Sequence, residues 1–292
     1  MKKQAIILLL LVATFGCAMA QTGGKVIEGA KINSTILKQV RNYSIYLPAD
    51  YDTSNRSYPV LYLLHGAGDD HTSWVQLGEV KAIADKAISE GIATPMIIVM
   101  PDAHEGYFNE LADSWHGEDF FFKELIPHIE KNFRARSDKQ YRAVSGLSMG
   151  GGGAIGYALR HPEMFSAVCP LSAAPGPKDY EEFINRAYKR IGKERIDALP
   201  EATLKTNYIE TNLIEKFLSL EGDQLEQVRK LKWYFDCGDD DHLGLRLDGM
   251  RQVMDKKMIP HEYRMRDGGH NWQYWRGSLP EVLKFVSNSF HR

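Results

Sequence analysis

Cysteine is scarce in this sequence, with only Cys17, Cys169 and Cys237 among 292 residues. The last two stand at the ends of short apolar runs that are typical of buried strands, so we expect both to be free, buried thiols. Neither has the spacing of a zinc site. The scarcity argues against a fold that depends on disulfides or on structural zinc.

An excess of charge of either sign is also missing. The chain has 36 Lys and Arg against 38 Asp and Glu, and its basic residues are scattered rather than clustered. Recognition of nucleic acids and of anionic membrane surfaces depends on clustered positive charge. We therefore predict neither as a partner.

Long hydrophobic runs are absent after the first twenty residues, so we predict no membrane span. Residues 1–20 combine a short positive start, an apolar run over 5–12 and small residues before a cleavage point near Ala20. We interpret them as a signal peptide and predict a secreted or periplasmic protein. A lipoprotein signal ending at Cys17 is a less favoured alternative, because the preceding residues fit a lipobox poorly.

Apolar runs of strand length alternate with segments of helical periodicity along the rest of the chain. This alternation predicts an α/β fold, with a mostly parallel central sheet and helices on both faces. We expect one domain over 21–292. An antiparallel strand within 25–47 should precede strands at 59–64, 96–100, 141–145, 166–171, 233–235 and 261–265. Helices are expected near 79–90, 118–133, 151–159, 243–254 and 272–289, with Pro280 breaking the last.

Residues 176–230 interrupt this rhythm with about twice the usual length between two strands. Their pattern is helical and amphipathic. Two interpretations are equally favoured: an elaborated crossover between strands, or a helical cap over an active site.

The run Gly146-Leu147-Ser148-Met149-Gly150 has the Gly-x-Ser-x-Gly pattern of a nucleophile elbow. It follows an expected strand and opens an expected helix rich in small residues, which is the context that the motif requires. The small residues allow a sharp turn that raises the serine hydroxyl above the sheet. We predict that Ser148 is a nucleophile, within an α/β-hydrolase fold.

A serine nucleophile needs a histidine base, and the base needs an acid to orient it. In this fold the partners follow in the order Ser, acid, His. His270, after two glycines and the last expected strand, is the best placed of ten histidines. Asp236, Asp239, Asp240 and Asp241 all stand near the end of the preceding strand, and the pattern alone does not choose among them.

The negative oxygen that forms during nucleophilic attack needs two backbone donors. One is expected from the amide of Met149, directly after the nucleophile. The other should come from the loop His65-Gly66-Ala67-Gly68, which follows an early strand. His65 itself is more simply explained as a residue that braces this loop.

Three separated motifs together resemble the esterase D/feruloyl esterase family, a carbohydrate esterase family 1-like group of α/β-hydrolases. They are Tyr58 to Gly66, Gly146 to Gly151 and Gly268-Gly269-His270. The resemblance runs from about Ser44 to the last helix, but 176–230 matches nothing in the family pattern. It implies a carboxylic ester hydrolase that works through an acyl-enzyme and uses neither a metal nor an organic cofactor.

The same resemblance refines two assignments. The family's acid usually stands three residues beyond a strand-ending glycine, which points from Gly238 to Asp241. Members also use the amide after the His-Gly pair, which is that of Ala67. The acidic neighbours of Asp241 depart from the common pattern.

Export and resemblance together favour feruloyl or acetyl esters on a plant xylan-type polysaccharide as the substrate. Trp115, Trp272 and Trp275 are candidates to line a groove for a sugar or an aromatic acyl group, although packing around the last helix would equally explain one or two of them. Two alternatives remain. One is hydrolysis of a siderophore ester, and the other is a catalytically inactive domain that binds glycan.

Overall fold

The computed structural model describes residues 23–104, 106–108, 111 and 115–291. The predicted signal peptide, Cys17 and the cleavage point near Ala20 lie outside these residues. Within the described part of the chain, no helix is long and apolar enough to cross a bilayer. Cys169 and Cys237 are free and buried, as predicted.

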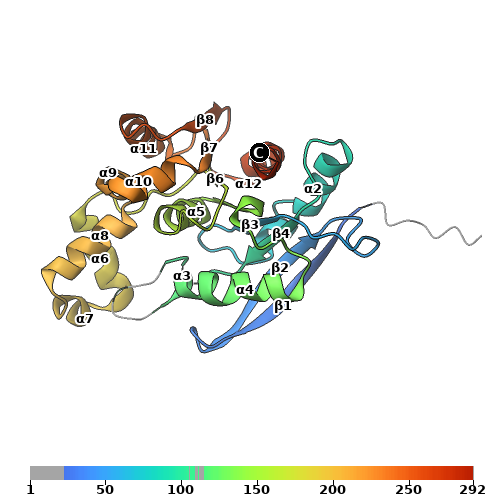
Figure 1. Ribbon diagram of the computed structural model, residues 1–292. Coiled ribbons are helices and arrows are strands. Elements are labelled where there is room, and N and C mark those ends of the chain that lie inside the picture. Colours follow the sequence, from blue (N-terminus) through green and yellow to red (C-terminus); the bar gives the residue numbers. More distant parts are fainter. Residues whose placement is uncertain (1–22, 105, 109–110, 112–114, 292) are drawn as a thin grey trace, which may run out of the picture.

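A single mixed sheet forms the centre of the described structure (Figure 1). Its strand order is β1-β2-β4-β3-β5-β6-β7-β8; β1 and β2 pair antiparallel, β2 also runs antiparallel to β4, and the remaining pairs are parallel. The strands are β1 Lys25–Ser34, β2 Gln39–Leu47, β3 Val60–Leu64, β4 Ile97–Pro101, β5 Arg142–Leu147, β6 Ala167–Leu171, β7 Lys232–Gly238 and β8 His261–Arg266.

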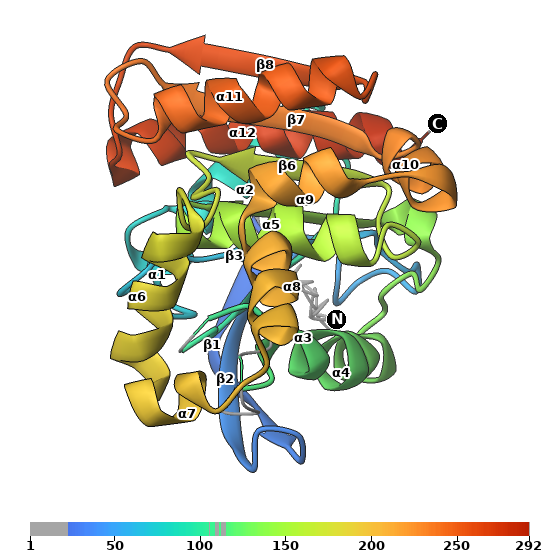
Figure 2. The ribbon, with the colours of Figure 1, turned by 90° about the vertical axis from the view of Figure 1, so that its left-hand side faces the viewer.

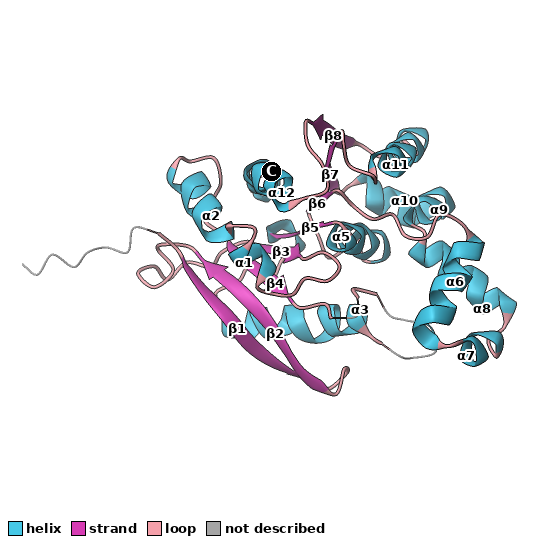
Figure 3. Ribbon diagram, turned by 180° about the vertical axis from the view of Figure 1, so that it is seen from behind, coloured by secondary structure: helices cyan, strands magenta, loops and turns pink. Residues whose placement is uncertain are grey.

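Helices cover both faces of this sheet, which confirms the predicted α/β architecture (Figures 1 and 3). Helices α1 Ser73–Gln76, α2 Val80–Ser89 and α12 Trp272–Phe290 pack on one face. The other face carries the π-helical turn η2 Phe121–Leu125 and helices α4 Ile126–Asn132, α5 Met149–Arg160, α9 Leu213–Ser219 and α11 Gly244–Lys256. Two further short elements are α3 Gly117–Phe120, which precedes η2, and η3 Lys139–Tyr141, which precedes β5.

Strand β3 is apolar along its whole length because both of its faces are covered. In β3, Val60, Tyr62 and Leu64 enter the core on one side of the sheet. Leu61 and Leu63 enter the core on the other side. Because successive side chains of a strand point to opposite faces of the sheet, the five consecutive apolar residues of β3 are divided between two cores.

The last helix differs from its prediction. α12 runs unbroken from Trp272 to Phe290 with Pro280 inside it, so the predicted break is wrong. A proline in a helix interior costs about 3 kcal/mol. The buried stripe that includes Leu279, Val282 and Val286 packs against the sheet on both sides of the proline and holds the helix together.

The insertion at 176–230 has two structurally different parts (Figure 2). Helices α6 Tyr180–Ile191, α7 Lys193–Asp197 and α8 Glu201–Thr211 bury side chains such as Phe183 and Leu204 in a small core that also includes Leu111. In contrast, α9 and α10 Gly222–Arg229 contribute to the main core. The part that stands apart from the sheet is therefore α6 to α8.

Candidate active site

Ser148 occupies a sharp turn between β5 and α5. Its φ is 53° and its ψ is −116°, a strained conformation for a residue with a side chain. Glycines permit the turn: a Cβ at Gly146 would lie 2.6 Å from the Gly150 carbonyl carbon, and one at Gly150 would lie 2.5 Å from the His65 carbonyl oxygen. The backbone therefore has the form expected of a nucleophile elbow.

His270 lies beside this serine in the loop between β8 and α12. Its Nε2 is 2.9 Å from Ser148 Oγ, and its Nδ1 is 2.8 Å from Asp241 Oδ2. A carboxylate only accepts hydrogen bonds, so Nδ1 carries the proton and Nε2 is left to accept the serine proton. The three residues follow β5, β7 and β8, whose carboxyl ends share one edge of the sheet.

Among the four candidate acids, only the Asp241 side chain contacts His270. Asp239 is exposed and accepts the Gly268 amide, and Asp240 is exposed beside it. The carboxylate of Asp236 is buried and accepts the Tyr234 hydroxyl at 2.9 Å. The turn after Gly238 directs one of three adjacent carboxylates inward, which the residue pattern alone did not show.

Hydrogen bonds hold Asp241 in its charged form. The side chain is fully buried, and burial by itself raises the pKa of its carboxyl. The hydrogen bonds from the Leu243 amide, at 2.9 Å, and from His270, together with the influence of the Ser172 hydroxyl, outweigh that effect. The pKa of Asp241 is therefore lower than its ordinary value, and the carboxylate can stabilise a protonated imidazole.

The two residues whose amides are predicted to hold a negative oxygen, Ala67 and Met149, both line the cavity at Ser148. Met149 is the first residue of α5, a position whose amide has no acceptor within the helix. Ala67 lines the same cavity as Ser148 and Met149. A Cβ at Gly66 would lie 3.7 Å from Ser148 Cβ, so this loop passes close to the serine.

His65 braces the loop, in agreement with its prediction. The Ala103 amide donates to His65 Nε2 at 2.9 Å, so the opposite nitrogen carries the proton and donates to the Gly66 carbonyl at 2.8 Å. Burial lowers the pKa of His65, which favours this neutral form.

A cavity of about 440 Å³ opens at Ser148. Its wall is mostly apolar and combines the loop around Tyr107, the start of α5 and the inner side of α6. The described lining residues are Ala67, Gly106, Tyr107, Phe108, Leu111, Ser148, Met149, Gly152, Ala174, Gly176, Pro177, Phe183, Arg186, Ala187, Arg190, Ile191, Asn207, Thr211 and Leu213. The contributions from α6 were not identified from the sequence, because helical periodicity does not say which face meets a cavity.

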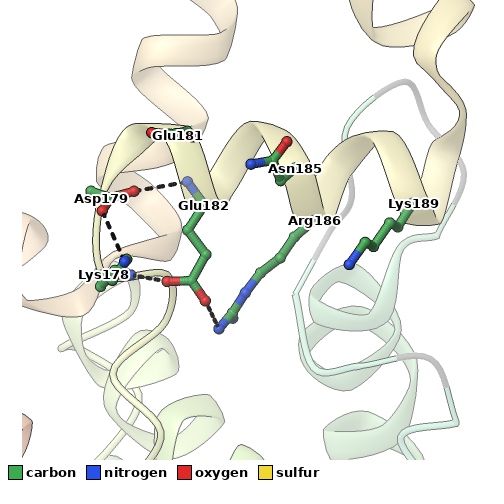
Figure 4. Close-up of a pocket in the computed structure, with 7 residues that line it drawn as sticks. All are labelled: Lys178, Asp179, Glu181, Glu182, Asn185, Arg186 and Lys189. Atoms are coloured by element: carbon green, nitrogen blue, oxygen red, sulfur yellow. Dashed lines mark hydrogen bonds and ion pairs between the residues drawn. The ribbon is translucent and has the colours of Figure 1, made fainter.

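Polar and charged side chains form a set of local contacts at the start of α6 and on its exposed side (Figure 4). Asp179 caps the helix by accepting the Glu182 amide at 2.8 Å. The Glu182 carboxylate accepts the Lys178 amide at 2.8 Å and also the Arg186 guanidinium. Arg186 thus belongs both to this charged outer groove and to the wall of the cavity.

The structure does not bring the three predicted tryptophans to the cavity wall. The indole nitrogen of Trp115 donates to the Gly106 carbonyl at 2.8 Å, under the Arg41 guanidinium. Trp272 packs edge-on against the ring of Trp74. Trp275 is only 5% exposed. None of the three indoles lines the cavity at Ser148, so contact of these side chains with a substrate outside that cavity stays a prediction.

One group of possible metal ligands coincides with the site. Asp241, His242 and His270 each offer an atom within 4.8 Å of the others. The Asp241 and His270 atoms already form a hydrogen bond, and the other nitrogen of His270 faces Ser148. This geometry fits a proton relay between serine and imidazole.

The sequence of the chain matches a protein-family model described as "Putative esterase" over residues 34–286. The chain belongs to this esterase family. A solved structure named as a ferulic acid esterase superposes with a TM-score of 0.79, is 36% identical, and covers 92% of this chain and 99% of its own. These findings confirm the family resemblance and the α/β-hydrolase fold, and they support the predicted enzyme class of carboxylic ester hydrolase.

Two curated relatives match a shorter stretch. Esterase MT1326 of Mycobacterium tuberculosis is 40% identical over 139 residues, or 46% of this chain and 28% of its own length. An endo-1,4-beta-xylanase/feruloyl esterase of Xylanibacter ruminicola is 38% identical over 136 residues, or 44% of this chain and 19% of its own. The matched stretch thus spans less than a third of either relative.

Proposed function

We propose that the protein is a secreted serine esterase that hydrolyses feruloyl or acetyl esters of a plant xylan-type polysaccharide through an acyl-enzyme. Ser148 is the nucleophile, His270 the general base and Asp241 the residue that orients the base. The continuous hydrogen bonding from serine to histidine to aspartate, at 2.9 and 2.8 Å, is the observation that carries this proposal.

The mechanism follows from the direction of those bonds. His270 Nε2 takes the proton of Ser148 as the hydroxyl oxygen attacks the ester carbon. The amides of Met149 and Ala67 donate to the negative oxygen, and each such donor contributes roughly 100- to 1000-fold in rate. His270 then returns the proton to the departing alcohol. Water repeats the sequence and releases the acid, leaving the serine free.

The cavity favours an aromatic acyl group over acetyl. Its volume, about 440 Å³, lies in the range of sites for small organic ligands. Phe108, Leu111 and Phe183 provide an apolar surface against which a feruloyl ring could pack. The names of the ferulic acid esterase and the xylanase/feruloyl esterase relatives support the same substrate class.

We further propose that residues 21–292 form one catalytic domain and that α6 to α8 serve as its cap. Side chains of α6 and α8 line the cavity that contains Ser148, while their hydrophobic cluster is separate from the main core. The proposed signal peptide, residues 1–20, supports export to the place where plant polysaccharide is met.

Assays on purified protein test the proposal directly. The enzyme should hydrolyse p-nitrophenyl acetate, and Ser148→Ala should abolish the activity. If the alanine variant keeps its activity, the assigned nucleophile is wrong. Release of ferulate and of acetate from a xylan preparation then identifies the acyl group. Binding to xylan without release of either would favour the inactive glycan-binding alternative.

A further inference from the structure

We propose that Ser172 and Trp275 are positioning residues that hold the Asp241 carboxylate and the His270 ring in their working geometry. The inference rests on the proposed function, because it concerns the same triad. It assigns a role to Trp275 other than the substrate contact expected from the sequence.

Ser172 is fixed in an unusual backbone conformation directly after β6. Its φ is 43°, in the left-handed region that non-glycine residues rarely occupy, and its side chain is completely buried. Its amide donates to the Asp236 carbonyl on the neighbouring strand at 2.8 Å. Such strain persists only where surrounding contacts over-determine it, and it concentrates at functional sites.

The indole of Trp275 determines where the Ser172 hydroxyl can donate. Trp275 Nε1 lies 3.0 Å from Ser172 Oγ, and an indole nitrogen is only a donor. The hydroxyl must therefore accept from Trp275, and its single proton remains for another acceptor. The Ser172 hydroxyl lowers the pKa of the Asp241 carboxyl, and we infer from this that the carboxylate is the acceptor. The Cys237 thiol is also a neighbour, but a carboxylate is a much stronger acceptor than sulfur.

Trp275 also contacts His270, the partner of Asp241 in the hydrogen-bonded pair. Its ring stands edge-on to the His270 ring, with centroids 5.0 Å apart and planes at 87°. One buried indole thus contacts the imidazole directly and fixes the orientation of the Ser172 hydroxyl. Loss of this indole would release the His270 ring from its contact and leave the hydroxyl free to turn away from Asp241.

Removing either support should slow catalysis without weakening substrate binding. We expect Ser172→Ala to lower kcat roughly 10- to 100-fold, the range for losing a hydrogen bond to a charged group. Trp275→Phe loses a hydrogen bond between neutral groups and should lower kcat about 2- to 10-fold. KM should stay within about twofold, because neither residue lines the cavity. Matched controls are Ser287→Ala, a buried serine of α12, and Trp233→Phe, whose indole donates to the Val228 carbonyl. Both controls should retain kcat.

Two further measurements separate positioning from general structural support. In an Asp241→Asn background, Ser172→Ala should have almost no additional effect on kcat, because its action passes through the carboxylate. The low-field proton resonance of the His270–Asp241 hydrogen bond should shift or disappear in both single variants. Additive losses, or an unchanged resonance, would overturn the proposal.

Failure of this inference differs from failure of the proposed function. If Ser148→Ala is inactive while Ser172→Ala and Trp275→Phe keep full kcat, the triad stands and the positioning role is wrong. If Ser148→Ala retains activity, the proposed function itself is wrong.

Discussion

Asparagine replacement of each of the four acidic candidates would separate catalytic from structural carboxylates. The site geometry predicts that Asp241→Asn lowers kcat by roughly 10,000-fold, the size expected when the orienting acid of such a triad becomes an amide. An amide has no charge to stabilise the imidazolium, and it can hold His270 in the wrong tautomer. The Asp241 side chain accepts from His270 Nδ1 at 2.8 Å and is completely buried, so bulk solvent does not reach it to take the place of the carboxylate.

The other three replacements should have different consequences. Asp239 and Asp240 are exposed, so their replacement should change stability by no more than about 0.5 kcal/mol and activity by about twofold. Asp236→Asn should mainly lower the free energy of unfolding. Its buried carboxylate accepts the Tyr234 and Tyr274 hydroxyls and pairs with Arg266. Breaking a buried ion pair costs about 3 kcal/mol at the low end, which applies here because Arg266 is partly exposed.

Two measurements on the same preparations test this ranking. Hydrolysis of p-nitrophenyl acetate gives kcat, and urea unfolding followed by fluorescence gives the free energy of unfolding. We expect Asp241→Asn to lose activity while remaining folded and Asp236→Asn to lose stability. Asp241→Asn with more than a tenth of the parent kcat, or an equal loss in Asp239→Asn or Asp240→Asn, would refute the reasoning.

Three other predictions follow from separate parts of the molecule. Phe183→Ala should raise KM for methyl ferulate several-fold by removing apolar contact from the cavity wall, with little change for p-nitrophenyl acetate; equal effects on both esters would contradict an acyl pocket at α6. Glu118→Gln should destabilise the protein at neutral pH, because the bonds from His161 and Arg160 lower the pKa of the buried Glu118 despite the opposing effect of burial. The stability that ionised Glu118 adds is present above the ordinary pKa of the carboxyl and is lost as pH falls through its lowered pKa. Urea unfolding at several pH values should therefore show the free energies of unfolding of the parent and of Glu118→Gln converging in acid; a difference that does not change with pH would be evidence against this. N-terminal sequencing of the exported protein should begin at Gln21, and recovery of a lipid-modified N-terminus at residue 17 would support the lipoprotein alternative.

Much of the fold could be predicted from the sequence because its signals are local. Apolar runs marked the central strands, and the Gly-x-Ser-x-Gly run indicated the turn at Ser148 before any contact was known. His270 could be selected from chain order, since the partners of the serine must follow successive strands of a parallel sheet. Pro280 shows the limit of local signals, because burial along α12 outweighs a helix-breaking residue.

The acid and the surroundings of the triad depended on long-range geometry. Three consecutive aspartates are chemically equivalent as sequence, and only the turn after Gly238 shows that Asp241 points inward while its neighbours face solvent. The role of the tryptophans could not be predicted from the sequence either, because an indole is chemically suited both to lining a groove and to packing in a core.

The sequence by itself determined the class of fold, the predicted nucleophile and base, and the family. Only the tertiary structure decided which aspartate meets His270, that Trp275 lies against the triad rather than in the cavity, and that α6 forms the cavity wall. The physical reason is that a strand, a turn or a motif is encoded by neighbouring residues. Contacts among side chains far apart in the chain depend instead on how all the elements pack together.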